Sequence, residues 1–312
     1  MAMKRYKGYL MVVVAASLWG ISGTAAQHLF QNSSVTMGWL VTVRLLGSGF
    51  LFLLFALLGR NKQAVWEVWT NKYSISHFLL FGLFGMLGVQ YTYFASIDAG
   101  NAAVATLLQY AAPVIILGYF LVKLRTVPNM FEIVAVTLTL AGTFLLLTDG
   151  TPQKLAVQKA GFIWGILSAF ALAFYTLYSG KLVKEYDSII VVGWGMMIGG
   201  LALSPVYPPL SFNMASLEVS TYSLILFVII FGTLIPFYLF IDSMRFITAK
   251  ESSLLSCSEP LSAVISSVLL LGIPFGLYQG IGALCIIFMV IVLTLKPKKA
   301  TSEDVQVEEM NL

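Results

Sequence analysis

Residues 76–124, SHFLLFGLFGMLGVQYTYFASIDAGNAAVATLLQYAAPVIILGYFLVKL, return without a gap as residues 223–271. At this offset of 147 residues, twelve of the 49 overlaid positions are identical. The pattern Leu107-Leu108-x4-Pro113 recurs as Leu254-Leu255-x4-Pro260. Similarity of a chain to itself at a fixed offset indicates a duplicated structural unit.

The composition places both units in a lipid bilayer. Of the 312 residues, 59% are hydrophobic and 10% are charged, whereas a soluble domain carries about 25% charged residues. Apolar runs of about 20 residues predict transmembrane helices. We find ten, at roughly 9–30, 36–58, 77–97, 101–122, 130–148, 161–181, 188–207, 220–241, 250–271 and 275–295. The sequence therefore predicts an all-α integral membrane protein, and we expect no nucleic-acid partner.

The basic residues predict the orientation of these ten helices, because cytoplasmic loops carry an excess of lysine and arginine. With the N-terminus in the cytoplasm, fifteen basic residues fall on the inner side. The outer loops hold two, Lys154 and Lys159, and Arg44 lies within a helix. We therefore expect a multi-pass protein of the plasma (inner) membrane with both termini in the cytoplasm.

The duplication then assigns the architecture. The offset overlays the third, fourth and fifth helices on the eighth, ninth and tenth, so each unit has five helices. Because five is odd, the second unit must be inverted relative to the first. We expect a first repeat at 8–148, an outer linker at 149–160, a second repeat at 161–295 and a disordered tail at 296–312. Inverted repeats are typical of alternating-access transporters.

Several motifs together resemble the EamA family of the drug/metabolite transporter superfamily. They are Trp19-Gly20, Arg44, Ala102-x3-Thr106-Leu107-Leu108-x4-Pro113 and Leu254-Leu255-x3-Glu259-Pro260. The resemblance implies a ten-helix fold with a central substrate cavity lined by helices 1, 3, 4, 6, 8 and 9. Many members carry Leu-Gly-Glu just past helices 4 and 9, but here residues 123–125 read Lys-Leu-Arg and residues 271–273 read Leu-Gly-Ile.

Glu259 is the main candidate for the chemistry of transport. It lies about ten residues into the ninth predicted helix, where a carboxylate costs at least ~2.5 kcal/mol and low polarity favours its neutral form. It belongs to a polar stripe at helical spacing, formed by Ser252, Ser256, Glu259, Ser262 and Ser266. Glu259 could bind a proton or substrate in the cavity, or it could be a protonated, purely structural hydrogen-bond donor.

Arg44 is the second charge at membrane depth, about 12 Å along the second predicted helix. It could pair with a substrate carboxylate or with Glu259. The resemblance places helix 2 outside the cavity, so we favour a structural role for Arg44.

Polar and aromatic residues on the other central helices predict an apolar-walled site with a few polar anchors. Each tyrosine could instead be a packing residue, whereas a mid-membrane amide needs a partner. The candidates for substrate binding are Trp19, Gln90, Tyr93, Gln109, Tyr175 and Tyr238.

Pro113 and Pro260 interrupt the helical hydrogen-bond ladder at equivalent places in the two units. Each proline is either a hinge or a static kink, which transmembrane helices tolerate. Their duplication favours the hinge.

An intramembrane enzyme is the rival function, because residues 20–23 spell the Gly-x-Ser-Gly string of rhomboid proteases. The nucleophile Ser22 would need a base, and His28 is about 9 Å away along the same helix. No nucleotide or metalloprotease motif occurs. The free thiols Cys257 and Cys285 lie in apolar segments, which favours neither disulfides nor a metal site.

We therefore expect a secondary transporter, not an enzyme, with no cofactor and no metal. Its partners would be the bilayer, a small-molecule substrate and protons as the candidate coupling ion. The resemblance most suggests export of an amino acid or related compound. Facilitated uptake without proton coupling is the alternative, and the sequence leaves the oligomeric state open.

Overall fold

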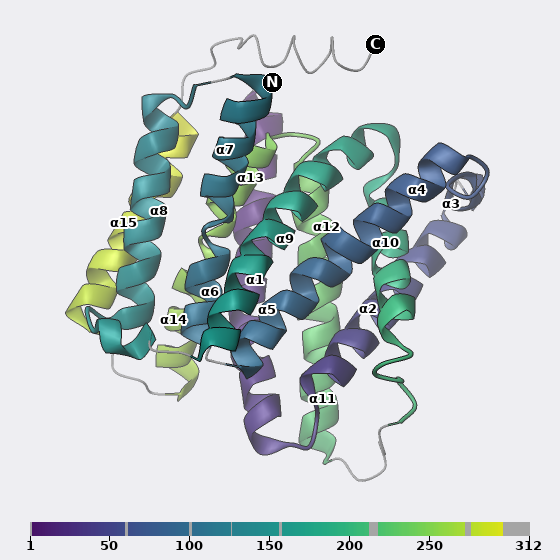
Figure 1. Cartoon of the computed structure of the whole chain (residues 1–312), viewed down its shortest axis with the longest axis horizontal. Coiled ribbons are helices and arrows are strands. Elements are labelled where there is room, and N and C mark those ends of the chain that lie inside the picture. Colours follow the sequence, from purple (N-terminus) through teal and green to yellow (C-terminus); the bar gives the residue numbers. More distant parts are fainter. Residues whose placement is uncertain are drawn as a thin grey trace.

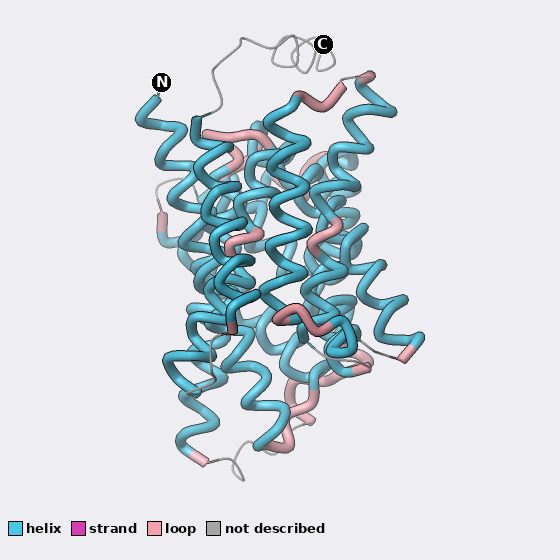
Figure 2. Tube along the Cα trace, turned by 90° about the vertical axis from the view of Figure 1, so that its left-hand side faces the viewer, coloured by secondary structure: helices cyan, strands magenta, loops and turns pink. Residues whose placement is uncertain are grey.

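A computed structural model describes residues 2–59, 62–99, 102–125, 127–155, 158–211, 218–271 and 276–295. Within these ranges the chain is helical apart from turns and short connections, and no strand occurs. Figures 1 and 2 show the helices lying side by side in one bundle. The tail expected at 296–312 lies outside the described residues.

The first half of the chain contains α1 (Ala2–Asn32), α2 (Met37–Leu58), α3 (Lys62–Glu67), α4 (Lys72–Leu80), η1 (Phe81–Leu87), α5 (Gly88–Asp98), α6 (Ala102–Gln109), α7 (Ala112–Leu124) and α8 (Met130–Thr148). The second half contains η2 (Pro152–Leu155), α9 (Lys159–Glu185), α10 (Ser188–Leu203), α11 (Val219–Ile229), η4 (Ile230–Leu234), α12 (Ile235–Ser243), α13 (Ala249–Ser256), α14 (Glu259–Leu271) and α15 (Leu277–Leu295). The elements η1 and η4 are π-helical turns that join α4 to α5 and α11 to α12.

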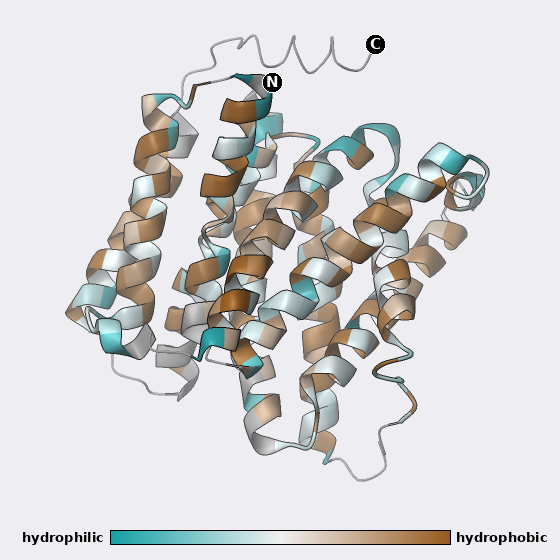
Figure 3. Cartoon of the chain, in the orientation of Figure 1, coloured by the Kyte–Doolittle hydropathy of each residue, from teal (hydrophilic) through white to brown (hydrophobic). Residues whose placement is uncertain are grey.

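The protein is a multi-pass membrane protein. Seven helical stretches are long and apolar enough to cross a bilayer. They are residues 4–30, 37–58, 72–98, 105–123, 130–148, 159–185 and 219–243. Large apolar side chains also point away from the bundle, as Phe55, Val122 and Phe288 do. Figure 3 shows hydrophobic residues along the flanking helices and hydrophilic residues gathered towards the ends. Lipid can cover such a surface, whereas water would disfavour it.

The helical elements repeat at the offset that the sequence shows. The bounds of α6, α7 and α8 differ from those of α13, α14 and α15 by 147 residues at both ends, as in 102 to 249 and 148 to 295. The π turns η1 and η4 both end on this offset, at 87 and 234. The start of α8 repeats as well: Asn129 donates its backbone N–H to Glu132 Oε2 at 3.2 Å, and Gly276 donates to Gln279 Oε1 at 3.0 Å.

Each half also contains one broken helix. The rod α6–α7 is interrupted at residues 110–111 and the rod α13–α14 at residues 257–258. Pro113 and Pro260 are the second residues of α7 and α14, where a proline costs little because the N–H groups of the first turn have no intrahelical acceptor. The prolines therefore begin the second half-helix, and the break lies two to three residues before them.

Candidate functional site

The two helix breaks meet inside the bundle. Tyr110, at the break between α6 and α7, is 1% exposed. Its hydroxyl lies 2.7 Å from Glu259 Oε2 and 3.1 Å from the Ser256 carbonyl oxygen, so it can donate to either. Both acceptors flank the break between α13 and α14. One side chain thus links the interrupted backbones of the two duplicated units.

Glu259 lies at a helix N-terminus and remains partly accessible. It is the first residue of α14, where the helix dipole and unpaired N–H groups favour a negative charge. As a residue, Glu259 has intermediate solvent exposure, whereas the neighbouring Tyr110 is buried. A carboxyl group at a helix N-terminus whose side-chain hydrogen-bond partner among the described residues is one tyrosine can exchange a proton or bind a positively charged group.

The polar stripe on α13 and α14 faces other helices. Ser266 Oγ lies 3.2 Å from Thr24 Oγ1 of α1, and Ser252 Oγ lies 3.5 Å from Ser243 Oγ of α12. Gly20 allows α1 to approach closely, since a Cβ there would lie 2.5 Å from the Glu259 carbonyl oxygen. The stripe is therefore packed against α1 and α12.

Tyr93 extends this polar region towards α5. Its hydroxyl is 2.9 Å from Thr106 Oγ1 of α6. The same side chain lies within electrostatic range of both Arg44 and Glu259. Tyr93 is therefore near both of the charged residues that the sequence places at membrane depth.

An aromatic cluster lies between α1, η1, α9 and α12. Trp19 contacts Phe237 and Phe240, with ring centroids 5.0 and 5.4 Å apart. Tyr175 stacks on Phe240 at 5.7 Å and on Phe81 at 5.8 Å. The Trp19 indole N–H and the Tyr175 hydroxyl are buried and have no hydrogen-bond partner among the residues that the structure describes. Such groups are costly in an apolar interior unless water or a ligand satisfies them.

Gln90 has two buried polar atoms without a hydrogen-bond partner among the described residues. Its side chain is 4% exposed, and both its amide nitrogen and its amide oxygen lack a partner among the described residues. Gln109 is also buried and is the last residue of α6, directly before the break at Tyr110. Four of the six residues predicted for substrate binding (Trp19, Gln90, Gln109 and Tyr175) thus lie at the break or carry unsatisfied polar atoms.

The profile of the EamA-like transporter family matches residues 6–148 and, a second time, residues 159–295. The chain belongs to the EamA-like transporter family. The Salmonella typhimurium protein named "Uncharacterized inner membrane transporter YicL" is 37% identical over 293 residues, covering 94% of this chain and 97% of the relative. A Bacillus subtilis protein, "Uncharacterized transporter YxxF", is 25% identical over 309 residues, and the match covers 96% of this chain and 94% of that relative. One solved crystal structure matches with a TM-score of 0.75 at 18% identity, covering 92% of this chain and 96% of that one, which shows a shared fold.

Arg44 of this EamA protein contacts the π-helical turn η4, which joins α11 to α12. Its Nε donates to Thr233 Oγ1 at 2.7 Å and a terminal nitrogen donates to the Gly232 carbonyl oxygen at 3.2 Å. Its guanidinium also lies over the Phe94 ring, 5.0 Å from the centroid. Within the described chain no carboxylate pairs with Arg44. These contacts hold the guanidinium against backbone that the π turn leaves irregular, in agreement with a structural role.

Tyr238 lies apart from the other candidates. Its ring packs against Phe52 of α2 at 6.3 Å, and its electrostatic neighbours are Asp242, Asp187 and Arg245. No hydrogen bond or ring contact in the described structure joins it to Glu259, Tyr110 or Trp19.

One residue of the site was not predicted from the sequence. Tyr110 is not among the residues predicted for the site, yet it makes the contact between the breaks. The signal that could have found it is its position, because the overlay pairs Tyr110 with Cys257 at the second break.

The described residues contain no group of three His, Cys, Asp or Glu side chains that could hold a metal ion.

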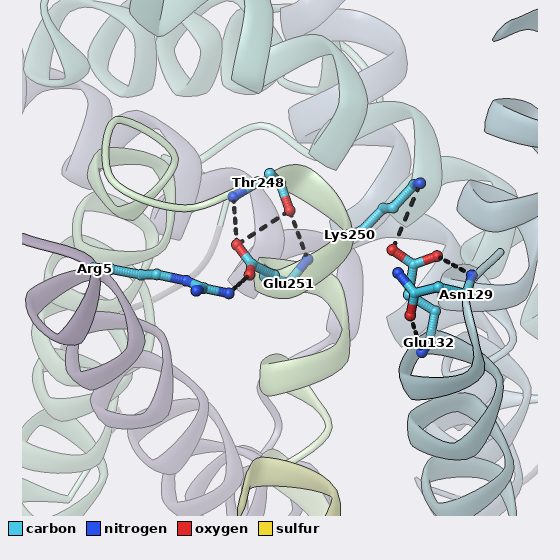
Figure 4. A network of polar contacts seen from close by, with 6 residues as sticks. All are labelled: Arg5, Asn129, Glu132, Thr248, Lys250 and Glu251. Carbon is cyan, nitrogen blue, oxygen red and sulfur yellow. Dashed lines mark hydrogen bonds and ion pairs between the residues drawn. The ribbon is translucent and has the colours of Figure 1, made fainter. Parts of the chain in front are cut away.

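The position of Glu251 at the start of the predicted helix 250–271 suggests a solvated carboxylate, and this expectation is wrong. It is 7% exposed and forms an ion pair with Arg5 of α1 (Figure 4). It also accepts a hydrogen bond from Tyr9 at 3.1 Å and caps the N-terminus of α13 through Thr248 at 3.0 Å. The sequence around Glu251 does not show that α1 packs over this carboxylate.

Proposed function

We propose that this EamA protein is a secondary active transporter that exports a small organic metabolite, an amino acid or related compound, across the plasma membrane by alternating access. The observation that carries the proposal is the meeting of two broken helices at Glu259. In transporters with internal repeats, interrupted helices form substrate and coupling-ion sites near the bilayer midplane, at the interface of the repeats. The link from Tyr110 to Glu259 and Ser256 lies between two such interruptions.

The proposed architecture has ten spans in two inverted five-helix repeats, 8–148 and 161–295, with both termini in the cytoplasm. Seven long apolar stretches, the shorter apolar helices at Ser188–Leu203 and Leu277–Val292, and the broken rod α13–α14 supply ten candidates. The two family matches and the repeated helix bounds support the division. Five spans in each repeat would invert the second repeat.

In the proposed mechanism Glu259 binds the coupling proton or the amine of the substrate. Trp19, Gln90, Tyr93, Gln109 and Tyr175 would line the path, and Pro113 and Pro260 would start the half-helices that move. The buried amide of Gln90 can both donate and accept a hydrogen bond, which suits the polar groups of a zwitterion.

A flux screen tests this function. Purified protein in proteoliposomes would be assayed with each labelled amino acid, with and without a pH gradient. We expect at least one amino acid to cross faster than in protein-free liposomes, and its flux to respond to the gradient. Flux without such a response would favour a facilitated carrier. Absence of flux for the whole set would contradict the proposed substrate class.

Cysteine accessibility tests the path. With Cys257 and Cys285 replaced by serine, the variants Trp19→Cys, Gln90→Cys and Gln109→Cys are expected to react with a water-soluble thiol reagent. Water must reach these positions if substrate does, and bound substrate should slow the reaction.

The control is Ala135→Cys on α8, a fully buried position outside the proposed path, which should stay unreactive. If all three path variants were as inert as this control, the three side chains would be packing residues.

A further inference from the structure

The end of the bundle that contains the N-terminus is fastened by ion pairs on both sides of α13. On one side, Glu251 pairs with Arg5 of α1 and accepts the hydroxyl of Tyr9. On the other side, Lys250 Nζ lies 3.7 Å from Glu132 Oε1 of α8. Figure 4 shows the two adjacent residues of α13 reaching in opposite directions to these partners.

Three of the four charged side chains are largely shielded from water, whereas that of Arg5 is 24% exposed. The side chains of Lys250 and Glu132 are 6% and 5% exposed, and that of Glu251 is 9% exposed. Lys250 also lies over the Phe120 ring of α7, 4.3 Å from its centroid. Buried partners lose much more than exposed ones when a pair is broken, because the remaining charge has neither its partner nor water. Separation of α13 from α1 or α8 therefore requires water to enter between them.

The repeat-related positions lack these charges. At the 147-residue offset, Lys250 corresponds to Ala103, Glu251 to Val104 and Glu132 to Gln279. Gln279 keeps the capping role of Glu132 towards its own helix, since it accepts the Gly276 N–H. For Glu132 the duplication thus preserved the helix cap and not the ion pair, so capping alone does not account for the charge of Glu132.

The half-helix α13 connects these ion pairs to the helix break. It has eight residues, Ala249–Ser256, and so spans about 12 Å. Glu251 lies in its first turn, and Glu259 follows directly after the break that ends it. A rigid half-helix fastened at one end and interrupted at the other can transmit a displacement between Glu259 and the ion pairs.

We propose that Arg5–Glu251 and Lys250–Glu132 form an ionic latch that closes this end of the transporter, and that α13 moves away from α1 and α8 when the latch opens. The proposal rests on the alternating-access function above, since a latch is needed only if this end opens during the cycle. The positions related by the repeat carry no such latch, so the two ends open under different control.

The test follows opening at α13 and does not depend on transport. In a background with Cys257 and Cys285 changed to serine, Ser253→Cys would report from α13, where Ser253 is 2% exposed. A membrane-impermeant maleimide would be added separately to right-side-out and inside-out vesicles. We expect slow labelling in the parent. In Arg5→Met and in Lys250→Met we expect labelling to be about tenfold faster than in the parent, or more. This acceleration should occur only when the maleimide is added on the side of the membrane that contains the N-terminus.

Conservative variants and a surface control separate a latch from a general loss of structure. Arg5→Lys and Lys250→Arg keep the charges and should label as slowly as the parent. Lys184→Met removes an exposed cation from the end of α9 and should have no effect. All variants would be checked for a monodisperse size-exclusion profile.

Parental labelling rates in folded Arg5→Met and Lys250→Met would overturn the latch, as would acceleration from the opposite side. If one of the two fails to fold, the other and the conservative pair still decide. A protein that shows the expected labelling and transports no amino acid would refute the proposed substrate class and leave the latch standing.

Discussion

Glutamine in place of Glu259 is expected to abolish the response of transport to a pH gradient while substrate exchange survives. Glutamine has nearly the shape of a protonated glutamate, so its amide oxygen can still accept the hydrogen bond that Tyr110 makes at 2.7 Å. It cannot take up or release a proton. If Glu259 binds the coupling proton, the variant should fold normally and exchange substrate without following the gradient.

The matched control is Glu67→Gln, which removes an exposed carboxylate at the end of α3 and should transport like the parent. Glu259→Asp shortens the side chain and should lower the rate, because the carboxylate then retreats from Tyr110. Proton coupling through Glu259 is falsified if Glu259→Gln keeps the parental rate and the parental pH dependence. Loss of flux confined to amine-bearing substrates would instead identify Glu259 as the amine-binding group.

Alanine in place of Gly20 is expected to destabilise the protein by about 2 kcal/mol or more. The added Cβ would lie 2.5 Å from the Glu259 carbonyl oxygen and 2.8 Å from the Ala263 backbone nitrogen. Because both atoms belong to the backbone of α14, no change of side-chain rotamer can relieve the contact. The helices α1 and α14 would have to separate at the first turn after the break, so transport should fall together with stability.

Gly23→Ala, three residues further along α1, is the matched control. A Cβ at Gly23 meets nothing within 4 Å, and alanine favours a helix over glycine by up to about 1 kcal/mol. Thermal unfolding of the two purified variants in the same detergent compares them directly. Equal melting temperatures for Gly20→Ala and Gly23→Ala would contradict the close packing of α1 on α14.

The sequence predicted the all-helical membrane class and the family, since both rest on composition and on motifs that recur along the chain. It placed Pro113 and Pro260 at equivalent positions, and the helices do break close to both. The location of each break also follows from these prolines, because a proline cannot donate a hydrogen bond to the carbonyl four residues before it. Those residues are Gln109 and Ser256, the last residues of α6 and α13.

Contacts between distant helices were the part that could not be predicted. Arg44 was expected to be structural, but its partners Thr233 and Gly232 follow it by 189 and 188 residues. Arg5 and Glu251 are separated by 246 residues. No periodicity in one segment reports which segment will pack against it, so Glu251 looked like an ordinary residue at a helix end.

The repeated break has a consequence for how new specificities can arise on this scaffold. Two segments of 49 residues with twelve identities adopt the same interrupted backbone, with Tyr110-Ala111 at one break and Cys257-Ser258 at the other. The backbone path is therefore compatible with very different side chains at the point nearest to the proposed cargo. Mutation can diversify those positions in either half without dismantling the bundle, which makes them the natural targets for redirecting the protein to a different metabolite.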